Sequence, residues 1–186
     1  MINRGVLTED DPVELLDGVI VQKAPKNPPH CVATENARAA FEAILPAGWF
    51  AREEKPITLA SSEPEPDLAV CRGMRRDYLE RHPGSADLGL VVEIADATLV
   101  RDRLLKEGIY AAAGIPWYWL LDLKTPRLEA YSEPRDGVFQ RTHVYAAGDA
   151  VPVELDGNVI GSISVSDLLP RQTSPAETPR GQQEEH

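Results

Sequence analysis

The sequence predicts an α/β fold in which a mixed β-sheet is flanked by helices and preceded by an N-terminal β-hairpin. Two short apolar runs, 67–71 and 88–95, have the composition of central strands that are buried on both faces. The second run opens a strand–helix–strand unit that extends over residues 88–122. Further short strands follow without intervening helices, so we expect a sheet that mixes parallel and antiparallel neighbours.

The N-terminal half contains the hairpin and one long helix. Residues 13–22 are two β-favouring runs around Asp17-Gly18, which is a strong signal for a tight hairpin turn. Residues 30–45 are rich in Ala, Glu and Leu and lack Gly and Pro, which predicts a helix. We expect an irregular strand over 49–59, a loop over 61–66, and one or two helical turns within 72–81.

The C-terminal half begins with a second helix. It is predicted over 98–113, with Gly114 as its C-cap and Pro116 just beyond. Strands are then expected over 117–122, 127–132, 138–145 and 151–155. The segment after residue 170 is rich in Pro, Gln, Ser, Thr and Glu, which is typical of disorder. We therefore predict one domain over 1–169 and a disordered tail over 170–186.

Composition limits the classes of function. The chain has 186 residues and a net charge of −11, which argues against tight non-specific DNA binding but allows a local basic groove. No apolar stretch approaches the roughly 18 residues of a membrane span, and no secretory h-region is visible at the N-terminus. Cys31 and Cys71 are far apart, so we expect reduced thiols at small buried positions in a cytoplasmic protein.

Two acidic residues are associated with the predicted central strands. Asp67 follows a proline and opens the first run, a position that Asp also occupies in ordinary turns. Glu93 lies inside the second run, where a carboxylate is costly to bury unless it is paired or bound to a metal. Glu53 and Glu54, one strand earlier, offer a further ligand, and the alternation of side chains lets only one of them face the site.

The 98–113 helix places a charged stripe beside its apolar side. At about 100° per residue, one arc of the helix is apolar; it comprises Leu104, Leu105, Gly108, Ile109 and Ala112. Asp102, Lys106 and Tyr110 stack at the border of this arc, so Lys106 can lean toward a carboxylate at a strand end. The alternative is a surface Asp–Lys pair with Tyr110 in the core.

Basic residues occur on both sides of Glu93 in the sequence. One group lies between Asp67 and Glu93 and the other on the following helix; they are Arg72, Arg75, Arg76 and Arg81, and Arg101, Arg103 and Lys106. Such charge suits a phosphate ligand, although solvated loop charge explains any single residue equally well. His30 suits both a helix start and a catalytic group. The chain contains no P-loop, G-x-S-x-G or G-x-G-x-x-G motif.

The order of these motifs resembles the Uma-two family of endonucleases, which belongs to the PD-(D/E)XK restriction-endonuclease-like superfamily. The resemblance extends from residue 14 to about residue 169 and includes the Pro-Pro-His30 helix start. Its motifs are Pro66-Asp67, Glu93, Asp102-x-x-x-Lys106-x-x-x-Tyr110 and Gly114-Ile115-Pro116-Trp117-Tyr118-Trp119. The resemblance implies a restriction-endonuclease-like fold, Asp67 and Glu93 as metal-binding carboxylates, and Lys106 as the catalytic lysine, displaced from the strand onto the helix.

Three positions depart from the family pattern. Ala95 stands where the superfamily has its strand lysine, 96–98 is Asp-Ala-Thr in place of Ser-Pro-Ser, and Trp117 replaces a Glu. The first departure makes Lys106 essential to a nuclease interpretation.

The predicted function is therefore a Mg²⁺- or Mn²⁺-dependent phosphodiesterase that acts on DNA. Asp67 and Glu93 hold the metal, Lys106 orients a water or neutralises charge, and Asp102, Tyr110, Glu54 and His30 support them. The alternative is a binding or assembly module that keeps the nuclease fold without hydrolysis, which the acidic charge and the missing strand lysine favour. The aromatic strand 117–119 also suggests a homodimer.

Overall fold

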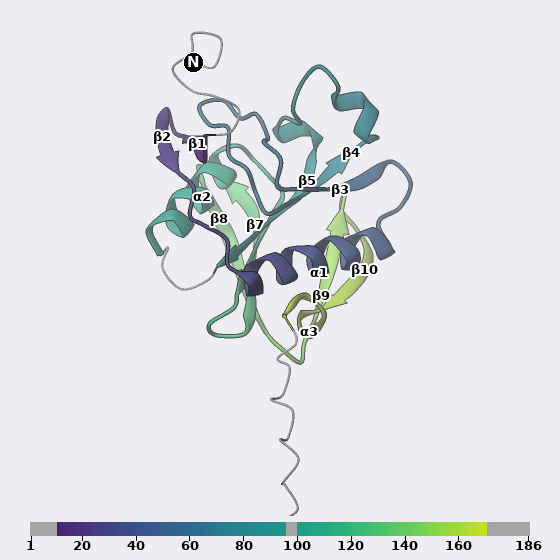
Figure 1. Ribbon diagram of the computed structural model, residues 1–186. Helices are drawn as coiled ribbons and strands as arrows, with labels where there is room; N and C mark the ends of the chain where they lie inside the picture. The colour runs from purple at the N-terminus through teal and green to yellow at the C-terminus, as the bar shows by residue number, and fades with distance from the viewer. Residues whose placement is uncertain (1–10, 96–99, 171–186) are drawn as a thin grey trace, which may run out of the picture.

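A six-stranded mixed sheet forms the centre of the computed structural model, which describes residues 11–95 and 100–170, apart from the side chains of residues 100–103 (Figure 1). The strand order is β3-β4-β5-β6-β7-β8, and only the β5–β6 pair is parallel. The strands are β3 (Trp49–Glu53), β4 (Leu68–Arg72), β5 (Leu88–Ala95), β6 (Trp117–Asp122), β7 (Arg127–Arg135) and β8 (Val138–Ala146). The predicted fold class is confirmed.

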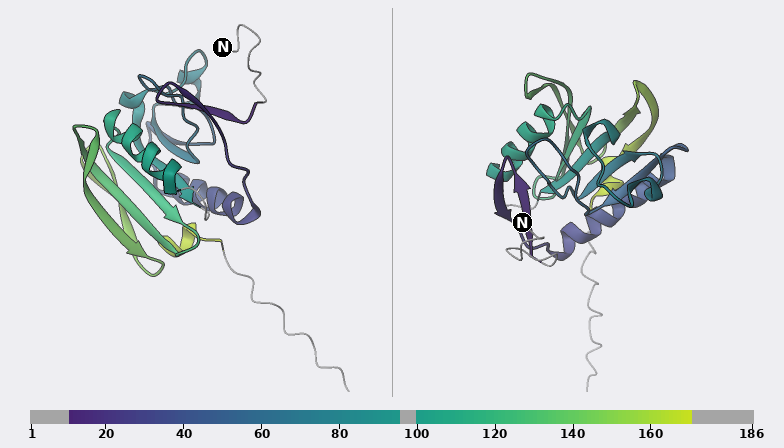
Figure 2. Two further views of the ribbon diagram at one scale, coloured as in Figure 1. Left: turned by 90° about the vertical axis from the view of Figure 1, so that its left-hand side faces the viewer. Right: turned by 90° about the horizontal axis from the view of Figure 1, so that it is seen from above.

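Two helices cover opposite faces of this sheet (Figure 2). Helix α1 (Pro28–Ile44) packs Phe41 against Trp119, together with the β9 (Ala150–Leu155) and β10 (Asn158–Ser164) hairpin and the short helix α3 (Val165–Leu168). Helix α2 (Val100–Ala112) covers the other face, where Tyr110 contacts Tyr118. Successive residues of the central strands contribute to opposite faces, which explains their nearly continuous apolar sequence.

The N-terminal hairpin consists of β1 (Val13–Leu16) and β2 (Val19–Gln22) and lies beside α2 (Figure 1). Its turn uses Asp17 and Gly18, both with positive φ, as a two-residue hairpin turn requires. The hairpin is attached to the segment before β4, because the backbone of Leu15 pairs with Glu63 and the Gly18 N–H donates to the Ser61 carbonyl. The predicted hairpin is present.

Some predicted boundaries differ from the structure. The irregular strand ends at Glu53, because Glu54 adopts a φ of +47° that leaves the extended conformation. The 72–81 segment forms a single 3₁₀ turn at Arg75–Tyr78. Strand β10 and helix α3 were not predicted, although the Asp156-Gly157 turn, with φ of +53° and +74°, is the same hairpin signal that marks the first turn.

Helix α2 buries a different face from the one that its helical wheel indicates. Leu104, at one edge of the apolar arc, is 63% exposed and Leu105 is also exposed, whereas Tyr110 and Ala111 are buried. The helix turns its charged border toward the sheet because Lys106 and Tyr110 bind a carboxylate there. The apolar arc instead lines a shallow groove with Leu59 and Ala60.

The burial of individual side chains also tests the expectations about the two cysteines and the homodimer. Cys71 is buried as expected, but Cys31 is exposed on α1, so the expectation of two buried thiols was wrong for Cys31. The aromatic strand 117–119 suggested a homodimer, but Tyr118 and Trp119 are buried in the core, so the homodimer is not supported. Among the described helices, none has the length and apolar character needed to cross a membrane. The predicted tail lies outside the described residues, except for its first residue.

Candidate metal centre

The predicted site residues meet at one end of the sheet. Asp67 directly precedes β4, and Glu93 lies near the end of β5, where the two strands pair as Leu68 with Val92. The first turn of α1 reaches the same end from one face, and α2 with the hairpin reaches it from the other. Antiparallel pairing of β4 with β5 therefore brings together two acids that are 26 residues apart in the sequence.

Asp67 is held by two donors that use the same oxygen. Its Oδ2 accepts the backbone N–H of Ile94 at 2.7 Å and lies 3.2 Å from His30 Nε2. The residue is only 6% exposed, so the carboxylate has little freedom to change orientation. Its other oxygen, Oδ1, faces Lys26 at 4.0 Å.

His30 is brought to Asp67 by the start of helix α1. Asn27 caps the helix by accepting the His30 backbone N–H at 3.0 Å. The His30 Nδ1 lies 3.4 Å from the Thr34 hydroxyl, one turn further along. Burial lowers the pKa of His30, but the hydrogen bond and the charge of Asp67 outweigh it, so the pKa is raised above 6.5.

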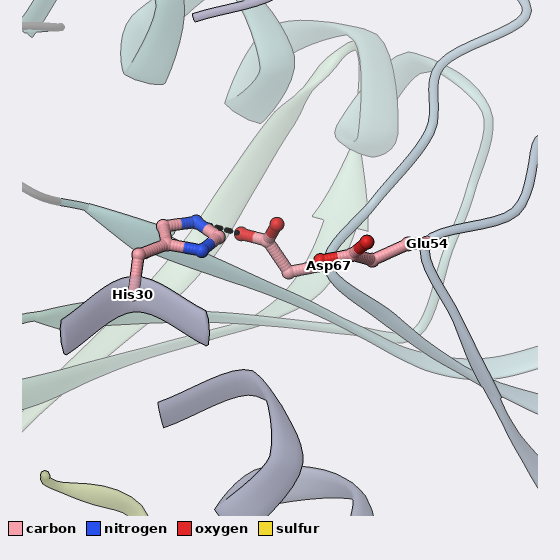
Figure 3. Close-up of side chains that lie close together, drawn as sticks. All are labelled: His30, Glu54 and Asp67. Atoms are coloured by element: carbon pink, nitrogen blue, oxygen red, sulfur yellow. Dashed lines mark ion pairs between the residues drawn. The ribbon is translucent and has the colours of Figure 1, made fainter. Parts of the chain in front are cut away.

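Glu54 completes a cluster of three potential metal ligands. One ligand atom from each of His30, Glu54 and Asp67 lies within 4.8 Å of the other two (Figure 3). Glu53 points elsewhere and pairs with Arg38 at 2.9 Å, which answers the question of which glutamate faces the site. The ammonium of Lys26 lies 2.5 Å from Glu54, so a positive charge already sits at the edge of this cluster.

Glu93 belongs to an adjoining group on the α2 side. Its Oε1 accepts hydrogen bonds from Lys106 Nζ at 3.1 Å and from the Tyr110 hydroxyl at 2.6 Å. Burial raises the pKa of Glu93 to about 7, against the opposing effect of Lys106, and the charge of Asp67 adds to the rise. Burial also raises the pKa of Tyr110, so its hydroxyl stays protonated and acts as a donor.

Lys106 has a second carboxylate partner that the sequence did not reveal. Its Nζ lies 3.2 Å from Glu14 Oε2 in the hairpin, and the lysine side chain is only 13% exposed. Burial lowers the pKa of Lys106, but the charges of Glu93 and Glu14 outweigh this effect and raise it. Glu14 and Lys26 were missed because only the docking of the hairpin and of the α1 entrance places them here.

Several other predicted residues lie elsewhere. The expectation that the first basic group flanks the acids was wrong, because it lies at the opposite end of β4, where Arg72 pairs with Asp156 and Arg81 with Asp87. The Asp102 side chain, the side chains of Arg101 and Arg103, and residues 96–98 lie outside the described part of the chain.

A mixed sheet with helices on both faces, and with carboxylates and a lysine gathered at one end, is the arrangement that the resemblance to restriction-endonuclease-like proteins implies. The Uma2 family, described as "Putative restriction endonuclease", matches residues 5–160 of this chain. The chain belongs to this family, which confirms the resemblance seen in the sequence. No curated protein sequence matches it.

A solved structure shares the fold. It is described as a "putative nuclease belonging to DUF820" from Anabaena variabilis ATCC 29413. The two chains are 20% identical, with a TM-score of 0.70, and the similarity covers 87% of this chain and 92% of the other. At this identity the comparison establishes the common fold alone.

Proposed function

We propose that the chain is a divalent-metal-dependent phosphodiesterase that cleaves DNA. The observation that carries the proposal is the cluster of His30, Glu54 and Asp67 beside the Glu93–Lys106 pair. Family membership supports a nuclease, and the description of the structural relative is consistent with one. Phosphoryl chemistry needs a cation to neutralise the phosphate and a fixed donor near the attacking water, and both requirements can be met at this end of the sheet.

The donor set fits a divalent metal. Asp67 Oδ2 is committed to the Ile94 N–H, which leaves Oδ1, the oxygen that lies 4.0 Å from the Lys26 ammonium. The Lys26 ammonium lies 2.5 Å from Glu54, and this ion pair supports the binding of a cation at this point. A bound metal would polarise the phosphate and lower the pKa of its water. Glu93 is the expected additional ligand, within electrostatic range of Asp67.

The residues around the cluster have separable roles. Lys106 stays protonated, because its pKa is raised, so it donates hydrogen bonds and neutralises charge but cannot act as a base. Tyr110 holds Glu93 in one orientation through its 2.6 Å hydrogen bond. His30 either binds the metal through Nε2 or keeps Asp67 oriented through its contact at 3.2 Å.

The chemistry of the donors favours Mn²⁺ or Mg²⁺. Carboxylate oxygens suit both ions, whereas an imidazole ligand is accepted more readily by Mn²⁺. If His30 is a ligand, Mn²⁺ should support more activity than Mg²⁺, and His30→Gln should narrow that difference. If His30 only orients Asp67, the same substitution should reduce activity with both metals to a similar extent.

The direct test is cleavage of plasmid and single-stranded DNA by the purified protein with each metal. Glu54→Gln and Glu53→Gln form a matched pair, because the two acids are adjacent and only Glu54 faces the cluster. We expect Glu54→Gln, Asp67→Asn, Glu93→Gln and Lys106→Met to lose cleavage, and Glu53→Gln to retain it. Metal-independent cleavage, or equal activity of all five variants, would contradict the proposal.

The alternative function is a module that binds without hydrolysis. Two features favour it: the net charge of −11 and the pairing of Lys106 with two carboxylates. Such a module would bind metal or a partner but would leave both kinds of DNA intact under every metal condition. Cleavage that disappears with Asp67→Asn would exclude it.

A further inference from the structure

The N-terminal hairpin delivers an acidic side chain directly to the lysine of the site. Glu14 Oε2 lies 3.2 Å from Lys106 Nζ, and the Glu14 side chain is only 8% exposed. The same oxygen accepts the backbone N–H of Glu65 at 3.2 Å. Glu14 is therefore fixed by the segment that leads into Asp67, and it in turn contacts the helix on the other side of the site.

With Glu14 in contact, the Lys106 ammonium is surrounded by more negative charge than is needed to neutralise it. Glu93 alone would balance the ammonium, yet Glu14 adds a second carboxylate in a largely buried position. Burying an additional carboxylate is costly unless its hydrogen bonds recover the cost. An ammonium has three N–H donors, and two carboxylates in fixed positions restrict both its location and the direction of the third donor.

We propose that Glu14 is a positioning residue, which holds the Lys106 ammonium at the site independently of Glu93. This inference rests on the proposed function, in which Glu93 also serves the metal. A carboxylate that engages a cation attracts a neighbouring ammonium less strongly. Glu14 is not part of the His30–Glu54–Asp67 cluster, so it keeps Lys106 in place while Glu93 is engaged. The third N–H then remains directed toward the reacting groups.

The competing explanation is that Glu14 only attaches the hairpin to α2. A merely structural contact would lower stability when removed but would not determine where the ammonium lies once Glu93 is changed. The two explanations therefore differ in the Glu93→Gln protein, where a positioning residue keeps Lys106 ordered and a structural contact does not.

The experiment follows the Lys106 ammonium by ¹H–¹⁵N NMR of lysine side chains, with its signal assigned from its loss in Lys106→Met. We expect a slowly exchanging signal in wild type and in Glu93→Gln, and loss of that signal when Glu14→Gln is added to Glu93→Gln, because neither carboxylate then holds the ammonium. Glu63→Gln is the matched control, since Glu63 is an exposed acid beside the hairpin that pairs with Thr58 and not with Lys106. It should keep the signal.

Three NMR outcomes would overturn the inference: no ordered signal in wild type, survival of the signal in the protein that carries both Glu14→Gln and Glu93→Gln, or its loss in Glu93→Gln alone. Loss of the signal in Glu93→Gln would overturn the inference even if variants with Glu14→Gln did not fold. Kinetics supply a second readout: with Mn²⁺, Glu14→Gln should lower kcat by about tenfold or more with little change in KM for DNA, because a displaced ammonium acts on the transition state. An unchanged kcat also overturns it. Absence of cleavage in wild type would refute the proposed function, whereas the NMR result decides the role of Glu14 separately.

Discussion

The two helices that cover the sheet obtain their burial in different ways. Helix α1 packs small and aromatic apolar residues against the strands, with Ala33, Ala37 and Phe41 fully buried. Helix α2 leaves Leu104 and Leu105 exposed and directs Lys106 and Tyr110 inward to Glu93. An apolar arc predicts the buried face of a helix only when apolar contacts dominate its packing, and buried ionic and hydrogen-bonded contacts can override that pattern.

The largest expected effect comes from removing the charge that α2 buries. Lys106→Met leaves Glu14 and Glu93 close together without their cation, so we expect the free energy of unfolding at pH 8 to fall by about 3–5 kcal/mol. Denaturant unfolding measures this loss. The loss should shrink at pH 5, where Glu93 can take up a proton because burial raises its pKa to about 7. A loss that is independent of pH would show that packing, not charge, is the cause.

Metal binding tests the α1 side of the site. Ligands that bind only the folded state stabilise it by about 2.7 kcal/mol at a hundredfold excess over Kd. Thermal unfolding with Mn²⁺ should therefore show a raised Tm for wild type and for Glu53→Gln. The Tm of Glu54→Gln and Asp67→Asn should rise little with Mn²⁺, and so should that of Glu93→Gln if Glu93 also binds the metal. Equal gains in all five proteins would assign the effect to surface acids.

The pH dependence of stability sharpens the comparison further. Because burial raises the pKa of Glu93 to about 7, the folded state binds a proton more tightly than the unfolded state does. The resulting contribution of Glu93 to the free energy of unfolding is fully present below the unfolded pKa of 4.5, and it is lost as the pH rises through 7. Between pH 5 and 8 the metal-free protein should lose on the order of 2 kcal/mol from this group.

Glu93→Gln should remove this part of the pH dependence. The raised pKa of His30 acts in the same direction, so some dependence should persist in that variant. Denaturant unfolding at several pH values, with a chelator present, provides the measurement. If the two proteins lose stability in parallel, the Glu93 pKa is not raised.

The smallest effect is expected on the outer side of α2. Leu104→Ser changes a side chain that is 63% exposed, so the free energy of unfolding should change by no more than about 0.5 kcal/mol. Phe41→Ala, on the inner side of α1, is the contrasting variant and should cost about 3–5 kcal/mol. A large loss from Leu104→Ser would show that the groove beside Leu59 contributes to folding.

The sequence was sufficient for those parts of the molecule that follow from local pattern. Short, nearly continuous apolar runs identified β4 and β5, and the border of the helical wheel identified Lys106 as a residue that can reach an acid. The sequence could not show whether Glu53 or Glu54 faces the site. The answer depends on the positive φ of Glu54, and a glutamate does not predict that conformation as a glycine would. Glu14 and Lys26 depend on how separate elements dock, and no local pattern encodes that.

Asp67 belongs to the candidate site and also helps to hold two strands of the sheet together. Its Oδ2 accepts the N–H of Ile94, so this acid of the proposed metal site also joins the beginning of β4 to the end of β5. Replacing it with alanine would leave a buried N–H without its partner, at a cost of about 1–3 kcal/mol. A related protein without the proposed catalysis would therefore still be selected to keep this aspartate. Under the proposed function, Glu54 is a better indicator of activity in related sequences than Asp67 or Lys106, because the loss of either of the latter also costs stability.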